Sequence, residues 1–122
     1  MIDPVPHLDF AKYLNAMDVL VLPSYSTPKW KEQFAQGLLM SMSCQVPVIG
    51  SSSGEIPNVI GDAGLVFPEG DKSALIDCLY RLRTNPRLRE DLIRSGVKRV
   101  EMHYTWRRLA EKTYQVWEML LN

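Results

Sequence analysis

Three short runs of apolar residues predict buried β-strands. They lie at residues 18–23, 47–50 and 65–67, and in the first two the apolar side chains are consecutive, not alternating with polar ones. Strands that are apolar on both faces are typical of parallel sheets covered by helices. Polar and turn-forming residues follow each run, which predicts where each strand ends. The pattern therefore indicates a three-stranded parallel sheet.

Between and after these runs, apolar residues recur every three or four positions, which predicts helices. We expect helices over residues 8–16 and 32–44, a short helical turn over 57–60, and a helix that Asp71 caps and Asn85-Pro86 ends. The apolar stripe of that capped helix and those of two helices after it are expected to lie in the core: Leu75, Cys78, Leu79 and Leu82; Leu88, Leu92, Ile93 and Val97; Trp106, Leu109, Ala110, Thr113, Trp117 and Leu120. Strands that alternate with helices predict an α/β fold.

The composition fits one globular domain. The chain has 122 residues, of which 46% are hydrophobic and 23% charged. Cys44 and Cys78 lie in apolar stretches, which predicts buried free thiols in a reducing compartment. No apolar run is long enough to cross a bilayer, and the first residues show no signal-peptide pattern. We therefore expect a cytoplasmic chain.

Charge is distributed unevenly although the net charge is zero. Residues 1–80 carry 4 basic and 9 acidic side chains, whereas residues 81–122 carry 10 and 5. A solvated helical face is the favoured interpretation of the basic end, because acidic residues are interspersed there. Peripheral contact with anionic lipid is the alternative. No aromatic-interleaved basic strand or zinc spacing supports nucleic-acid binding.

Common catalytic motifs are absent from the sequence. It contains no phosphate-binding Gly-x-x-x-x-Gly-Lys loop, no Gly-x-Gly-x-x-Gly, no Cys-x-x-Cys, no His-Glu-x-x-His and no Gly-x-Ser-x-Gly. We expect no metal site, and we interpret His7 and His103 as surface or capping residues. What is present is a strand, a polar loop and a helix that starts near Glu32, an arrangement that can bind a phosphate beyond the strand end. On spacing alone, an ordinary helix start explains Glu32 better.

Four segments in order carry a stronger signal: residues 17–24 (MDVLVLPS), 32–35 (EQFA), 40–49 (MSMSCQVPVI) and 54–71 (GEIPNVIGDAGLVFPEGD). They resemble the second half of the nucleotide-sugar domain of family 4 glycosyltransferases, which are retaining enzymes of the GT-B architecture. The resemblance covers about residues 8 to 121 and includes Tyr104-Thr105-Trp106 at the start of the last helix. It implies a Rossmann-like partial domain over residues 1–122, with a strand/helix core over 8–84 and C-terminal helices over 85–122.

The resemblance also implies a donor site that uses no metal or other cofactor. Glu32 matches the glutamate that contacts hydroxyls of the donor sugar, and the backbone N–H groups of Phe34 and Ala35 match those that face the sugar and diphosphate. Fixed N–H donors stabilise the charge that builds on a leaving diphosphate. Gln36 and Met40 complete the expected donor-binding set, and the loop that holds Ser52, Ser53 and Gly54 is expected near the donor.

Three departures from the family pattern lie in or near this site. Met40 stands where a second glutamate would hold the ribose hydroxyls, and a thioether cannot accept those hydrogen bonds as a carboxylate does. Ala35 and Gln45 stand where the family has glycine, the latter at the expected end of a helix.

The resemblance further implies that the acceptor domain and the early donor-domain strands lie outside this sequence. The strand at Val19 to Leu22 would then form an edge, and an exposed apolar edge pairs with another chain. Its expected partner is a second copy or a complementary glycosyltransferase half. Two functions follow: a glycosyltransferase-derived region that binds a nucleotide sugar but is incomplete or inactive alone, or a non-catalytic interaction domain that self-associates through this strand.

Overall fold

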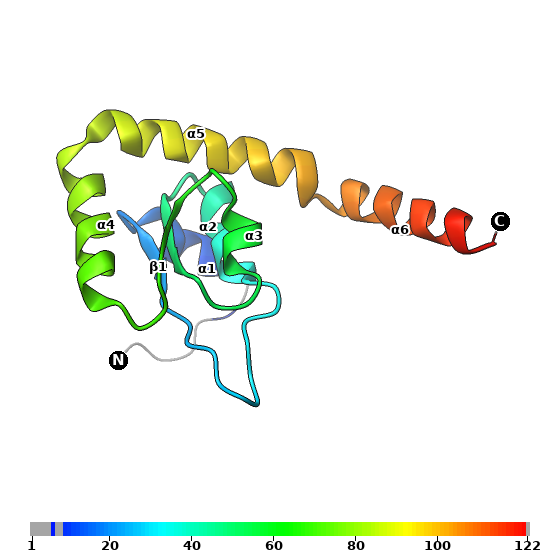
Figure 1. Cartoon of the computed structure of the whole chain (residues 1–122). Helices are drawn as coiled ribbons and strands as arrows, with labels where there is room; N and C mark the ends of the chain where they lie inside the picture. Colours follow the sequence, from blue (N-terminus) through cyan, green and yellow to red (C-terminus); the bar gives the residue numbers. More distant parts are fainter. Residues whose placement is uncertain (1–5, 7–8, 122) are drawn as a thin grey trace.

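The computed structural model describes residue 6 and residues 9–121 of the chain. It has nine elements in the described part, and their order alternates between helix and strand as far as β3 (Figure 1). The elements are α1 (Phe10–Asn15), β1 (Leu20–Leu22), α2 (Gln36–Ser43), β2 (Val48–Ser51), α3 (Ile56–Ile60), β3 (Leu65–Phe67), α4 (Lys72–Thr84), α5 (Pro86–His103) and α6 (Trp106–Leu121). Leu8, with which the first helix was expected to begin, and His7 lie outside the described residues.

The three strands form one parallel sheet in the order β1-β2-β3. Leu20 pairs with Val48, and Ile49 pairs with Leu65. The sheet confirms the predicted α/β, Rossmann-like class. Because β1 is at the edge, it has a strand neighbour on one side only among the described residues.

Alternate side chains of the strands enter two separate cores, as the two-residue period of a strand requires. Val48 lies with α2 and α3 on one face of the sheet, where Leu20 and Leu22 pack against the same cluster. Ile49 lies on the other face with Leu65, Phe67 and side chains of α4 and α5. The sheet therefore has a core on each face, but of its three strands only β2 is fully buried, and Val66 of β3 is exposed.

Helix caps explain where α4 and α5 begin. Asp71 accepts a hydrogen bond from the backbone N–H of Ala74 at 2.9 Å, as the sequence predicted. Asn85 does the same for Leu88 at 3.0 Å, with Pro86 as the first residue of α5. The Asn85-Pro86 pair therefore ends one helix and starts the next.

Three expectations about the core were wrong. Leu79, assigned to the core stripe of α4, is 37% exposed. The stripe of α6 is not in the core, because α6 has no buried residue and extends away from the sheet (Figure 1). Cys78 is buried and Cys44 only half-buried, although both are free. Burial raises the pKa of the Cys78 thiol, and the nearby charge of Arg81 opposes that rise.

No helix among the described residues is long and apolar enough to span a membrane.

Candidate functional site

Serine side chains join the loops that follow β1 and β2. The Ser51 hydroxyl donates to the backbone oxygen of Ser24 at 2.6 Å. The hydroxyls of Ser26 and Ser53 lie 2.8 Å apart and share a hydrogen bond. Because carboxyl ends of parallel strands meet at one edge of the sheet, residues far apart in sequence meet here.

Glu69 joins the loop after β3 to the same cluster. Its carboxylate accepts a hydrogen bond from the backbone N–H of Ser26 at 2.7 Å, and its own N–H donates to the Ser52 hydroxyl at 3.0 Å. Ser24, Ser26, Ser51 and Glu69 were not among the predicted site residues. Their positions directly after predicted strands were the signal that could have identified them.

Glu32 is fixed to this cluster by three hydrogen bonds. Its carboxylate accepts from the Ser24 hydroxyl at 3.1 Å and from the backbone N–H of Ala35 at 3.2 Å. Its backbone oxygen accepts from the N–H of Glu55 at 3.0 Å. A Cβ on Gly54 would lie 2.0 Å from that backbone oxygen, so only glycine fits there. The carboxylate is half-buried, oriented and still has free acceptor capacity.

The spacing predicted that Glu32 lies in the first turn of a helix, and this prediction was wrong. The helix α2 begins at Gln36, because Ala35 has a left-handed backbone with φ of 51° that interrupts the helical pattern. Phe34 precedes this turn and is 48% exposed instead of packing with Leu38. The left-handed backbone at Ala35 turns the chain, so that the N–H of Ala35 points at the Glu32 carboxylate and donates a hydrogen bond to it.

The structure separates the predicted site residues into two groups. The strand-end cluster contains Glu32, Ala35, Ser52, Ser53 and Gly54. The other three line a separate groove of about 200 Å³ where α2 meets the end of α5 and the start of α6: Phe34, Gln36 and Met40, together with Tyr104 and Trp106 among others. Met40 is half-buried among largely apolar neighbours there.

The strand-end cluster is suited to binding hydroxyl groups. Ionised carboxylates accept hydrogen bonds from sugar hydroxyls. The backbone N–H groups of Gln36 and Gly37, at the start of α2, directly follow Ala35 and suit a phosphate. No group of three or more His, Cys, Asp or Glu side chains that could hold a metal occurs in the described part. His103 is exposed at the end of α5, in agreement with a surface role.

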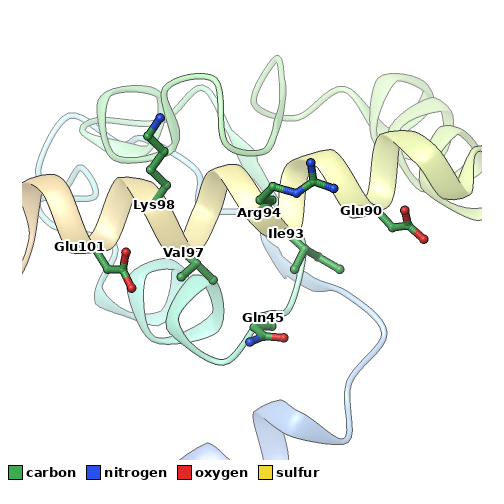
Figure 2. A pocket seen from close by; sticks show the side chains of 7 residues that line it. All are labelled: Gln45, Glu90, Ile93, Arg94, Val97, Lys98 and Glu101. Atoms are coloured by element: carbon green, nitrogen blue, oxygen red, sulfur yellow. The ribbon is translucent and has the colours of Figure 1, made fainter.

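Another hollow lies on the surface of α5, away from the strand ends. This groove of about 530 Å³ is lined by Gln45 and six residues of α5. Figure 2 shows Ile93 and Val97 on the side of α5 that faces Gln45, with charged side chains around them. None of the predicted site residues lines it.

The chain is similar to several known glycosyltransferases. It is 28% identical to the O-antigen chain mannosyltransferase B of Escherichia coli over 116 residues, which is 95% of this chain and 29% of that protein. It is 33% identical to the phosphatidyl-myo-inositol mannosyltransferase of Mycobacterium leprae over 110 residues, or 88% of this chain and 28% of that protein. The chain thus spans less than a third of the length of these relatives.

Solved structures show the same fold. A sucrose-phosphate synthase from Thermosynechococcus elongatus matches with a TM-score of 0.81 and 28% identity, covering 98% of this chain and 29% of that one. The C-terminal domain of a group 1 glycosyl transferase from Francisella tularensis matches with a TM-score of 0.74 and 22% identity, covering 87% of this chain and 53% of that one. The family model described as "Glycosyl transferases group 1" matches residues 2–85, more than half of the chain. The chain therefore belongs to the group 1 glycosyl transferases, as a GT-B fragment.

Proposed function

We propose that the chain binds a nucleotide sugar at the strand-end cluster, as the donor-binding part of a glycosyltransferase. The observation that carries this proposal is Glu32, whose carboxylate and backbone are fixed by Ser24, Ala35 and Glu55. A carboxylate held in this way is preorganised to accept sugar hydroxyls, at little cost in side-chain entropy on binding.

The diphosphate is proposed to lie toward the first turn of α2. The N–H of Leu38 already donates to the Ala35 backbone oxygen at 2.9 Å, so the donors left for a phosphate are those of Gln36 and Gly37, at the positive end of the helix dipole. These donors would stabilise the diphosphate without a metal. We therefore expect chelators to leave donor binding unchanged.

Met40 is proposed to weaken donor binding. Its thioether lies in the groove beside Phe34, where a ribose diol would find no carboxylate acceptor. The whole enzyme's transfer reaction is also proposed to need segments that these 122 residues do not supply, since the relatives are more than three times as long.

Calorimetric titration with UDP-, GDP- and ADP-sugars tests the proposal. We expect binding in the high micromolar to millimolar range, weakened about tenfold by Glu32→Gln, which removes the charge that strengthens a hydrogen bond to a hydroxyl. Met40→Glu should tighten binding. Glu90→Gln on exposed α5 is the matched control. Equal affinities for Glu32→Gln and the unaltered chain would refute the role of Glu32.

A second candidate function is an interaction domain that receives a strand at β1. Leu20 donates its N–H to Pro47 on the inner side at 3.0 Å, so the N–H and C=O of Val21 face the outer edge. The occupant is a second copy, as the self-association hypothesis requires, or a complementary glycosyltransferase half. Val21→Pro removes the outward donor and spares the bond to β2, so it should abolish strand addition while the fold persists. Light scattering of the chain alone distinguishes the two occupants.

The compartment and the domain limits are also proposals. Two free cysteines fit a reducing cytoplasm, and residues 1–122 are proposed to act as one partial domain. Membrane contact through the basic C-terminal helices stays a prediction, which sedimentation with anionic vesicles tests.

A further inference from the structure

The loop between β1 and α2 contains both Glu32 and a residue that orients it. We call residues 23–35 the β1 loop; Figure 1 shows that it extends away from the strands. The hydroxyl of Ser24 donates to the Glu32 carboxylate at 3.1 Å. Farther along, Thr27 and Trp30 exchange two backbone hydrogen bonds, at 2.8 and 3.2 Å, and form a tight turn. A loop that extends in this way keeps one shape only where other elements hold it.

Hydrogen bonds between neutral groups join the β1 loop to the end of β2. The Ser51 hydroxyl donates to the backbone oxygen of Ser24 at 2.6 Å. The hydroxyls of Ser26 and Ser53 lie 2.8 Å apart. Each bond of this kind adds only modest net stability. A further restraint comes from the third strand.

Glu69, in the turn after β3, is the charged restraint on the β1 loop. Its carboxylate accepts a hydrogen bond from the backbone N–H of Ser26 at 2.7 Å. A hydrogen bond to an ionised carboxylate is roughly twice as strong as one between neutral groups. On the same turn Gly70 lies against the ring of Tyr25, since a Cβ on Gly70 would lie 3.2 Å from a ring carbon. The turn therefore contacts two successive residues of the loop.

The turn that carries Glu69 is itself fixed. The N–H of Asp71 donates to the backbone oxygen of Pro68 at 3.0 Å, which closes the turn. The N–H of Glu69 donates to the Ser52 hydroxyl, also at 3.0 Å. One end of the turn follows β3 and the other leads into α4. Glu69 is thus a fixed point from which the β1 loop is held.

We propose that Glu69 is a positioning residue for donor binding, because it holds Ser26 and thereby orients Glu32. Holding the backbone of Ser26 keeps Ser24, two residues earlier, where its hydroxyl reaches the Glu32 carboxylate. Without Glu69 the loop samples other shapes, and ordering the carboxylate again on binding costs affinity. The proposal rests on donor binding at the strand-end cluster, but the orientation of Glu32 is measurable without a donor.

Amide NMR of the complete, donor-free chain tests the restraint itself. The Ala35 signal reports on the site, because the Ala35 N–H donates to the Glu32 carboxylate. Glu69→Ala should shift the signals of both Ser26 and Ala35. Glu69→Gln should restore the Ala35 signal, because its amide oxygen still accepts the Ser26 N–H. An Ala35 signal that stays in place in Glu69→Ala would overturn the proposal.

The matched control is Asp71→Ala, on the same turn. It removes the carboxylate that caps α4 through the N–H of Ala74 and keeps Glu69. We expect a lower melting temperature with the Ser26 and Ala35 signals in place. If this variant shifts both signals as far as Glu69→Ala does, the effect belongs to the turn as a whole and the proposal is wrong.

Calorimetric titration with UDP-, GDP- and ADP-sugars tests the effect on binding. We expect Glu69→Ala and Ser24→Ala each to weaken binding by about fivefold, and the double variant by little more, because both changes interrupt the same route to Glu32. Losses that multiply would overturn the proposal, since Glu69 would then act by direct contact with the donor or through stability alone. If the unaltered chain binds none of these sugars, donor binding fails as a function, and the donor-free spectra still decide whether Glu69 orients Glu32.

Discussion

At the scale of single residues, the candidate site depends on backbone that only small side chains permit. Gly54 lies against the backbone oxygen of Glu32, and its φ of 53° favours glycine. The same oxygen accepts the N–H of Glu55, so the loops after β1 and β2 are held together at this point. The orientation of the Glu32 carboxylate therefore follows from the absence of a side chain at position 54.

Gly54→Ala should destabilise the chain by about 2 to 3 kcal/mol, because the new methyl group collides with backbone and the left-handed conformation becomes strained. Gly37→Ala is the matched control, since its Cβ meets nothing within 4 Å in α2 and should stabilise by about 0.5 to 1 kcal/mol. Urea unfolding measures both. Equal stabilities of the two variants would contradict the close contact with Glu32.

At the scale of elements, sequence pattern predicted the strands well and the ends of the helices unevenly. The run at 65–67 is β3 itself, but only Leu65 and Phe67 are buried, because Val66 is 39% exposed. The predicted start of α2 was wrong, because alanine is not a residue type that indicates a left-handed backbone, which Ala35 nevertheless adopts. The face of α6 was assigned to the core because periodicity gives the apolar side of a helix but not what covers it.

The end of α2 offers a prediction of stability. Val46 donates to Ser41 and Gln45 donates to Met42, at 2.9 and 3.1 Å, a Schellman motif with Gln45 in the left-handed position at φ of 61°. Gln45→Gly should therefore stabilise the chain by about 1 kcal/mol, as relief of the left-handed strain.

The matched control is Gln115→Gly, in the interior of α6, which should reduce helicity because glycine is about 1 kcal/mol worse than other residues there. Thermal unfolding followed by circular dichroism compares them. A loss of stability in Gln45→Gly would show that the side chain itself matters.

The pH dependence of α6 follows from Glu111. Its hydrogen bonds from Arg108 and then Arg107 hold the pKa of the carboxyl below its ordinary value of 4.5. The pKa is thus lower in the helix than in the unfolded segment. The interaction stabilises α6 above the ordinary pKa and is lost as pH falls through the lowered one.

Circular dichroism should show that the helicity of α6 decreases as the pH falls through the lowered pKa of Glu111. The decrease should be smaller in high salt, because salt screens the exposed charges and weakens the interaction at every pH. Glu111→Gln should remove this component of the pH dependence. An unchanged acid transition in that variant would mean that other carboxylates govern it.

At the scale of the whole molecule, we propose two functional surfaces. The strand-end cluster binds the donor, and the outer edge of β1 accepts a strand. The site residues expected from the family resemblance fall into two places, because Ala35 turns the chain between Glu32 and Met40. Local pattern could not predict this separation, since it depends on loops that meet only when three strands are aligned.

Amide NMR of the labelled chain, titrated with UDP-, GDP- and ADP-sugars, tests donor binding at the strand-end cluster most directly. A dispersed spectrum, with shifts confined to Glu32, Ala35, the first turn of α2 at Gln36 and Gly37, Met40 and the loop at 51–54, is the predicted result. A dispersed spectrum that no nucleotide sugar changes would contradict the account, as would shifts confined to the groove around Phe34 and Met40.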